Sequence, residues 1–218
     1  MTNSAKPNKK RIVVLISGSG TNLQAIIDAC KSNYINGDIV GVVSNKADVY
    51  GLTRAEHADI ENCVLSHKDY DSREAYDQAL IEQINTFKPD LVILAGFMRI
   101  LTANFVQQYN GKLLNIHPSL LPKYPGLHTH RKAIENNETF HGTTVHFVTE
   151  ELDGGPLIGQ SKTRLLSNDT EGSLNKRIQS LEHKLYPYIA KLLLNDKIKL
   201  IEDDVYFENR KLEKPIVV

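Results

Sequence analysis

The stretch "RIVVLISGSGTNLQAII", residues 11–27, decides the fold class. Its first seven residues form an almost uninterrupted apolar run, rich in β-branched side chains, which is typical of a strand buried on both faces. Glycines follow at positions 18 and 20, and apolar residues then recur at positions 23, 26, 27 and 30, the spacing of one helix face. A buried strand, a glycine turn and a helix in this order predict the first unit of an α/β domain.

The same alternation continues along the chain. Further apolar runs predict strands at residues 38–44, 63–66, 90–96 and 111–117. A helix is expected from about Asp71, with Asp71 as its cap, Glu74 three residues on, and Pro89 marking its end. Strands that alternate with helices predict a Rossmann-like, doubly wound and mostly parallel sheet.

The pattern changes beyond residue 126. Residues 142–150 and 155–166 alternate like antiparallel strands, a long helix is expected from about Thr170, and residues 197–212 predict a pair of short strands. The expected fold is therefore α/β with an antiparallel C-terminal extension. We expect a disordered tail over residues 1–10 and a single domain over residues 11–218.

Composition excludes several classes of partner. The chain has 26 Lys and Arg against 26 Asp and Glu, so no overall field favours nucleic acid or an anionic membrane. Cys30 and Cys63 are far apart, which argues against a disulfide framework or a zinc site. No segment approaches the ~20 apolar residues of a membrane helix, and the run at 12–16 is too short for a secretion signal. We expect a cytoplasmic protein that binds neither nucleic acid nor membrane.

The glycine loop "SGSGTN", residues 17–22, has the composition of an anion site at a helix N-terminus. It does not match a dinucleotide motif, because Leu23 stands where the third glycine is required, and it lacks the lysine of a P-loop. Two readings remain open. The loop binds one phosphate monoester, with side-chain donors from Thr21 and Asn22, or it is only a tight turn.

Asn115 and His117 lie at the carboxyl end of an expected parallel strand, the edge where α/β sheets bind ligands. An amide donor and a protonated imidazole on the same side suit an oxyanion that develops in acyl transfer. Pro118 restrains the backbone of the histidine. Asp153, in a glycine-rich turn, is the expected third member, because a nearby carboxylate favours the charged imidazole. The alternative is a core histidine bonded to backbone and an ordinary turn aspartate.

Other histidines raise the question of a metal. His128 and His130, with His141 and His146, lack a third ligand at a recognisable spacing, so we expect no metal. His146 faces the same way as Thr144 in its strand and is expected to support the site rather than to catalyse.

Four segments, in this order, resemble the phosphoribosylglycinamide formyltransferases: "SGSGTNLQAII", "LAGFMRIL", "NIHPSLLPKYPGLHTHRKAI" and "HGTTVHFVTEELDGGPLI". The resemblance covers roughly residues 11–190. It implies transfer of a formyl group from 10-formyltetrahydrofolate, the cosubstrate, to the amine of glycinamide ribonucleotide in purine synthesis. Both partners are small molecules. Apart from the resemblance, an edge strand or the apolar third strand could support a homodimer.

The resemblance also implies roles for individual residues. It places catalysis on Asn115, His117 and Asp153, the substrate phosphate on Gly20, Thr21 and Asn22, and the ribose hydroxyls on Glu182. Folate contacts would come from Arg73, Leu94, Met98, Arg99, Ile100, Leu101, Asn115 and Val148, with Phe105, Val106 and Leu113 completing the pterin pocket. Without the resemblance, most of the apolar members would be assigned to the core.

Three other functions compete with this one. A deformylase would use the same three residues to pass the formyl group to water. A transfer-RNA formyltransferase would need an RNA-contacting domain and a basic surface. A non-catalytic nucleotide-binding module would account for the glycine loop but leave the Asn, His and Asp without a role. We expect direct transfer, because no activated cysteine or serine lies in these motifs.

Overall fold

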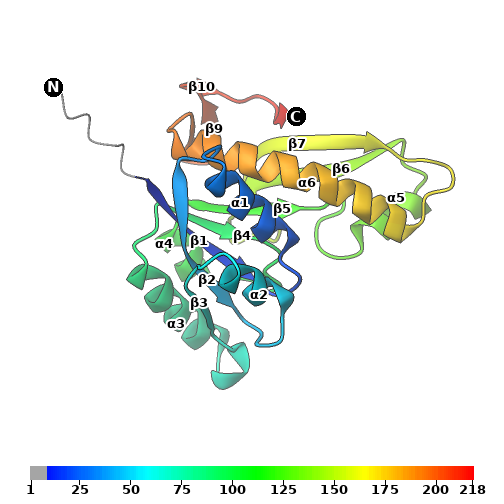
Figure 1. The fold of residues 1–218 in the computed structure, drawn as a ribbon. Helices are drawn as coiled ribbons and strands as arrows, with labels where there is room; N and C mark the ends of the chain where they lie inside the picture. The colour runs from blue at the N-terminus through cyan, green and yellow to red at the C-terminus, as the bar shows by residue number, and fades with distance from the viewer. Residues whose placement is uncertain (1–8) are drawn as a thin grey trace.

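The computed structural model describes residues 9–218 and contains one large mixed sheet (Figure 1). Its strands are β1 (Lys10–Ile16), β2 (Gly37–Ser44), β3 (Asn62–Val64), β4 (Leu91–Leu94), β5 (Leu113–His117), β6 (Phe140–Phe147), β7 (Leu157–Arg164) and β11 (Ile216–Val217). They lie in the order β11-β7-β6-β5-β4-β1-β2-β3. Strands β1 to β5 run parallel, whereas β6 is antiparallel to both β5 and β7. The expected α/β fold with an antiparallel extension is confirmed.

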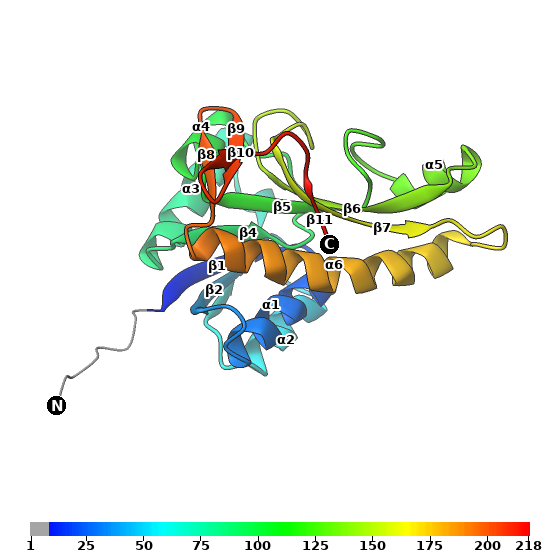
Figure 2. The same cartoon turned by 90° about the horizontal axis from the view of Figure 1, so that it is seen from above.

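Helices cover both faces of the sheet (Figure 2). Helices α1 (Thr21–Lys31), α2 (Tyr50–Glu56) and α6 (Glu171–Leu194) pack with one apolar cluster, which includes Ile16, Leu23 and Tyr186. Helices α3 (Arg73–Thr86) and α4 (Ala103–Gln108) pack with a second cluster on the opposite face. The remaining helices are the short α5 (Thr129–Glu135) and a 3-10 turn at His67–Asp69. Apolar burial on both faces explains why β1 and β4 are almost entirely apolar.

Some sequence expectations were wrong in detail. Helix α3 begins at Arg73, and its cap is Ser72 rather than Asp71, because the Ser72 hydroxyl accepts the N–H of Ala75 at 3.0 Å. Strand β1 begins at Lys10, one residue before the expected boundary. Lys9 is exposed and has no regular secondary structure, and residues 1–8 of the expected tail lie outside the described residues.

The C-terminal region has more strands than the pair expected. Strands β8 (Ile198–Ile201), β9 (Asp204–Phe207) and β10 (Arg210–Lys211) form a separate antiparallel sheet, and β11 extends the main sheet beside β7. The expected pair at 197–212 is therefore three strands, and β11 follows them.

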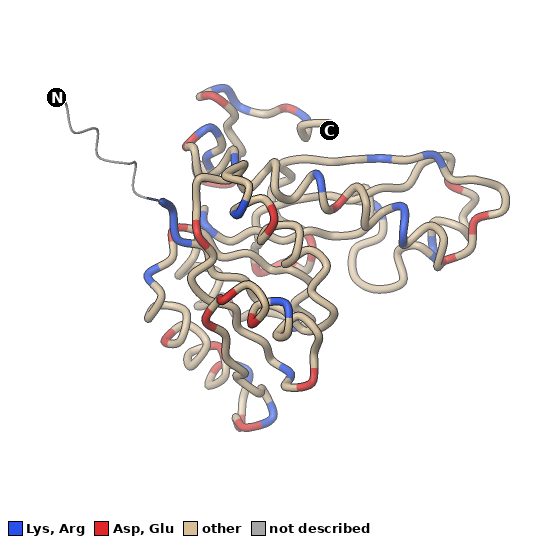
Figure 3. Tube along the Cα trace, viewed as in Figure 1, with Lys and Arg blue, Asp and Glu red and all other residues tan. Residues whose placement is uncertain are grey.

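The topology fixes where a ligand can bind. From β1 the chain winds outward through β2 and β3 on one side, and then returns to place β4 and β5 on the other. The switch point lies between β1 and β4, and α/β sheets bind ligands at the carboxyl ends of the strands there. Positions of Lys and Arg are interspersed with those of Asp and Glu along the trace (Figure 3). Within residues 9–218, no helix is both long enough and apolar enough to cross a membrane.

Candidate functional site

The glycine loop joins the carboxyl end of β1 to α1. Gly20 is the residue before the helix and has φ +71°, and a Cβ at this position would lie 2.7 Å from the Cα of Gly51. Both facts require glycine. No side chain caps the N-terminus of α1 in the described residues, so the first-turn N–H groups are not satisfied by a side-chain cap. This arrangement suits an anion.

Glu182 of α6 lies directly beside this loop. The Nδ2 of Asn22 donates to its carboxylate at 2.9 Å, and the residue is only 6% exposed. Burial raises the pKa of Glu182, and its contacts with Asn22 and Thr143 oppose that rise. The amide donor that the sequence offered to a phosphate is therefore directed to Glu182 in this structure. It links the glycine loop to α6.

Asn115, His117 and Asp153 meet at the carboxyl end of β5. The Nδ1 of His117 lies 3.3 Å from one Asp153 oxygen, and the Nδ2 of Asn115 donates to the other at 3.4 Å. The side chains of His117 and Asp153 are 7% and 8% exposed. Asp153 has φ 52°, a left-handed conformation that aspartate tolerates better than most residues. The turn thus directs its carboxylate at both partners.

The loop after β5 closes over the same group. The Nε2 of His117 lies 2.8 Å from the carbonyl oxygen of Tyr124, and the N–H of Gly126 donates to Asp153 at 2.8 Å. A carbonyl can only accept, so Nε2 carries a proton. With a carboxylate oxygen 3.3 Å from Nδ1 as well, each ring nitrogen of His117 faces an acceptor.

His146 holds Asn115 from the neighbouring strand β6. Its Nδ1 donates to the Phe147 carbonyl at 2.7 Å, which leaves Nε2 to accept from the Asn115 amide at 3.2 Å. Burial lowers the pKa of His146, so this ring is neutral at pH 7. The neutral ring therefore orients the amide, which matches the supporting position expected for His146.

His130 and His141 form a second pair behind the loop. Their ring nitrogens lie 3.0 Å apart, and the other nitrogen of His130 lies 3.2 Å from the side-chain oxygen of Asn175. Burial lowers the pKa of both rings, and that of His141 falls to about 4. No group of three or more His, Cys, Asp or Glu side chains in the described chain is placed to hold a metal ion. The pair instead joins α5 and β6 to α6.

Residues 10–189 match the family model described as "Formyl transferase". The chain belongs to this family. It is 54% identical over 201 residues to the phosphoribosylglycinamide formyltransferase of Escherichia coli (strain K12), covering 92% of this chain and 95% of that protein. It is 45% identical over 205 residues to the enzyme of that name from Haemophilus influenzae, covering 94% and 97% of the two chains.

Solved structures agree with these relatives. The phosphoribosylglycinamide formyltransferase of Coxiella burnetii, solved in complex with CHES, has a TM-score of 0.93 and 43% identity. The match covers 96% of this chain and 99% of that one. The fold and the formyl transferase family are thus supported by sequence and by structure.

The residues that the family resemblance assigned to folate lie on the face of the sheet opposite α1. Leu94, Leu101, Phe105, Val106 and Leu113 are buried in one cluster, and Val148 packs against it. Ile100 and Met98 are 53% and 64% exposed, and the Met98 N–H donates to the Ser17 hydroxyl at 2.8 Å. The structure thus packs six of these apolar residues into one core cluster and leaves Met98 and Ile100 at the surface.

The two arginines of this set differ in their surroundings. Arg73 is exposed at the start of α3, with its Nε 3.8 Å from Glu74. The guanidinium of Arg99 lies 4.8 Å from the centre of the Tyr76 ring, and its Nε is buried without a hydrogen-bond partner in the described chain. Arg99 thus lies against an aromatic ring, whereas Arg73 lies at the surface beside a carboxylate.

Sequence reasoning missed several contributors to the site of this formyl transferase. Tyr124 and Gly126, whose backbone groups contact the site, lie in the proline-rich stretch after His117. The sequence therefore marked this stretch, but it did not show the contacts, which depend on the loop conformation. The pairing of His130 with His141 joins residues eleven apart, which spacing alone does not indicate. Helix α2, with its Arg54, was not predicted.

Proposed function

We propose that this chain transfers the formyl group of 10-formyltetrahydrofolate to the amine of glycinamide ribonucleotide in purine synthesis. The observation that carries the proposal is the convergence of Asn115, His117 and Asp153 at the switch-point edge of the sheet. The glycine loop and the buried Glu182 lie on the same side of the molecule, at the end of β1. An oxyanion site and an anion site on one edge fit an acyl transfer to a phosphorylated acceptor.

In this mechanism the neutral amine of the ribonucleotide attacks the formyl carbon. A nitrogen–carbon bond forms while the carbonyl oxygen gains negative charge, and Asn115 and the protonated His117 donate hydrogen bonds to that oxyanion. The intermediate then collapses and the bond from carbon to N10 of the folate breaks. The attacking nitrogen loses one proton, and N10 gains one through solvent. No covalent bond to the enzyme is needed.

In the proposal, Asp153 sets the donor role of His117. At 3.3 Å from Nδ1 it stabilises positive charge on the His117 ring, so that the ring donates rather than accepts at Nε2. Because the Nε2 proton is directed at the Tyr124 carbonyl in this structure, the developing oxyanion must compete with that carbonyl. The loop after β5 is therefore part of the reaction geometry.

Substrate binding follows the same edge. The phosphate is assigned to the backbone of Gly20, Thr21 and Asn22 at the N-terminus of α1, where the helix dipole favours an anion. The ribose hydroxyls are assigned to Glu182. The apolar residues around Leu94 and Val148 would bind the pterin of the folate. Asn115 and the segment 98–101 would lie beside the pterin, and Arg73 would bind a carboxylate of the folate. A homodimer stays a prediction.

The experiment follows the loss of 10-formyltetrahydrofolate by absorbance, with and without glycinamide ribonucleotide, for the wild type and His117→Ala. We expect loss only with the ribonucleotide, and strongly reduced loss in the variant. Loss without the ribonucleotide would identify a deformylase and overturn the proposal. No loss in the wild type would leave a non-catalytic binding module.

A further inference from the structure

Helix α2 holds the glycine loop from outside the sheet. The N–H of Gly51 donates to the carbonyl of Gly18 at 3.1 Å, and the Nε of Arg54 donates to the carbonyl of Ser19 at 2.9 Å. A Cβ on Gly20 would lie 2.7 Å from the Cα of Gly51, and a Cβ on Gly51 would lie 2.5 Å from the Cδ1 of Ile16 and 3.0 Å from the carbonyl oxygen of Gly18, so both positions are too tight for a side chain. The conformation of the loop therefore depends on α2 as well as on its own glycines.

Arg54 is fixed in place by three contacts. Besides its bond to Ser19, its Nη1 donates to the side-chain oxygen of Gln24 at 3.1 Å, and its guanidinium lies 4.8 Å from the centre of the Tyr50 ring. The remaining nitrogen, Nη2, makes no hydrogen bond within the described chain. A planar guanidinium held in this way presents a donor without further loss of rotamer freedom.

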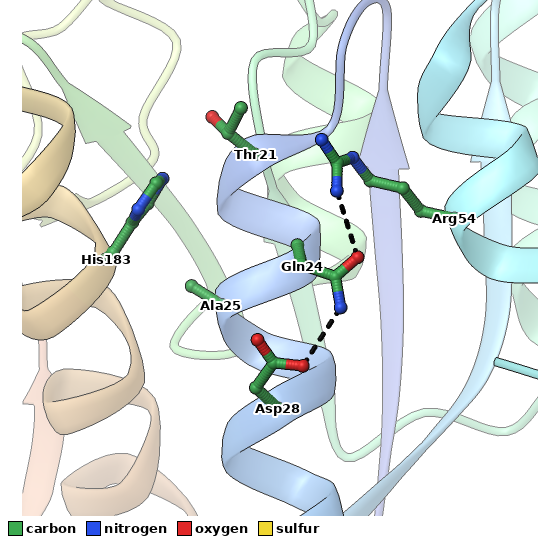
Figure 4. Close-up of a pocket in the computed structure, with 6 residues that line it drawn as sticks. All are labelled: Thr21, Gln24, Ala25, Asp28, Arg54 and His183. Atoms are coloured by element: carbon green, nitrogen blue, oxygen red, sulfur yellow. Dashed lines mark hydrogen bonds between the residues drawn. The ribbon is translucent and has the colours of Figure 1, made fainter. Parts of the chain in front are cut away.

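That guanidinium lines a hollow of about 300 Å³ between α1, α2 and α6. Figure 4 shows Arg54 and His183 on opposite sides of α1, with Thr21 at the end of the helix nearest the guanidinium. The Nε2 of His183 is buried and has no hydrogen-bond partner in the described chain. Arg54 is the only permanently charged cation among the residues that line this hollow.

The acidic residue of the hollow lies away from its cationic end. Asp28 is seven residues beyond Thr21, about 10 Å along the helix, and its carboxylate accepts from the Nε2 of Gln24 at 2.9 Å. Gln24 therefore directs its oxygen at Arg54 and its nitrogen at Asp28. The end of the hollow nearest the N-terminus of α1 therefore carries the positive charge of Arg54.

We propose that Arg54 determines the preference for a phosphorylated acceptor, by fixing the glycine loop through Ser19 and by donating from Nη2 to the phosphate dianion. The inference rests on the proposed function and adds to it a residue outside the glycine motif. Arg54 links the glycine loop to the hollow, because its guanidinium donates to the Ser19 carbonyl and also lines the hollow. Lysine cannot reproduce this, since its point charge lacks the fork that bonds both at once.

The test uses steady-state kinetics of formyl transfer for the wild type, Arg54→Gln and Arg54→Lys. Inorganic phosphate serves as a competitive probe of the anion site. Arg11→Gln is the matched control, because the Nε of Arg11 also donates to a backbone carbonyl, that of Phe87 at 2.7 Å, at the opposite end of β1. Thermal unfolding of each variant establishes that it is folded.

For Arg54→Gln we expect the KM for glycinamide ribonucleotide to rise about 10- to 100-fold, the effect of losing a hydrogen bond to a charged group. The kcat should stay within about threefold, and the inhibition constant of inorganic phosphate should rise in parallel with KM. Arg54→Lys should fall between the wild type and Arg54→Gln. Arg11→Gln should match the wild type in every constant.

Other results would overturn the inference. A KM within threefold of the wild type, a fall confined to kcat, or an unchanged phosphate inhibition constant for Arg54→Gln would show that Arg54 has only structural contacts, with Ser19, Gln24 and Tyr50, and does not bind the phosphate. Full activity of Arg54→Lys would refute the role of the guanidinium fork. If the wild type itself transfers no formyl group, it is the proposed function that fails, and the two failures are thus distinguishable.

Discussion

Replacing Glu182 with Gln should make the ligand-free protein more stable and less able to bind its acceptor. The carboxylate is 6% exposed, and burial raises its pKa even though Asn22 donates to it at 2.9 Å. The direction of that shift means that the cost of burying the charge exceeds the gain from its hydrogen bonds. Glutamine removes the charge and can still accept from Asn22.

The magnitude follows from opposing contributions. Burying a carboxylate costs several kcal/mol, and hydrogen bonds to a charged group return about 1.5–3 kcal/mol each, so the net penalty is on the order of 1 kcal/mol. For a chain of this size that raises Tm by about 2–4 °C. The ribose hydroxyls would lose a charged acceptor and keep a neutral one, a difference of about 1–2 kcal/mol, so KM for the ribonucleotide should rise about tenfold.

The pH dependence supplies an internal check on the cause. A raised folded pKa means that the ionisation penalty is fully present above that pKa and disappears below the unfolded value, near 4.5. The difference in the free energy of unfolding between the wild type and Glu182→Gln should therefore shrink as the pH falls towards that value. Urea unfolding at a series of pH values measures it.

Glu171→Gln is the control, because this carboxylate lies in the first turn of the same helix and is 45% exposed. It should change neither the pH-dependent difference nor KM. A Glu182→Gln protein that is less stable than the wild type at pH 7, or that keeps the wild-type KM, would refute the reasoning.

Three further predictions concern the histidine and amide groups. Asn115→Ala should lower kcat by about 10²–10³ through loss of an oxyanion donor, and a fall of less than tenfold in steady-state assays would contradict that role. His146→Leu should lower kcat by about tenfold and the free energy of unfolding by about 1–3 kcal/mol, measured with urea, because the Asn115 amide and the Phe147 carbonyl lose their partner. The pKa of His141 is about 4 in the folded state, so the unfolded state binds the proton first as the pH falls. The free energy of unfolding should therefore decrease by up to about 3 kcal/mol between pH 6.5 and 4. His141→Gln should flatten this dependence of the free energy of unfolding on pH, and an unchanged dependence would refute the prediction.

The parallel half of the fold could be predicted from the sequence, because each strand there is a short apolar run bounded by glycine, proline or a helical pattern. The carboxyl-edge position of His117 followed from this alone, and so did its proximity to Asn115 two residues earlier. Asp153 is brought to them by β6 and a left-handed turn. The glycine-rich turn made Asp153 a candidate for the site, but no distance from Asp153 to Asn115 or His117 follows from the sequence.

What the sequence could not supply are contacts that depend on packing between distant elements. Glu182 reads as a solvated helix residue until α6 is packed on α1, which buries it against Asn22. Arg54 lies in a seven-residue helix with little periodicity to detect, and its bond to Ser19 spans 35 positions. The local sequence pattern does not predict such pairs of residues, because their contacts form only when the whole sheet is assembled.

The buried imidazoles of the site differ in the groups that face their ring nitrogens. His141 and His146 are nearly inaccessible, and desolvation is the largest cause of the fall in their pKa values. His117 is almost as buried, but a carboxylate lies 3.3 Å from its Nδ1 and a carbonyl 2.8 Å from its Nε2. His117 therefore has an acceptor at each of its ring nitrogens. A ring with an acceptor at each nitrogen, beside the His146 ring that orients Asn115, is the geometry on which the proposed oxyanion site rests.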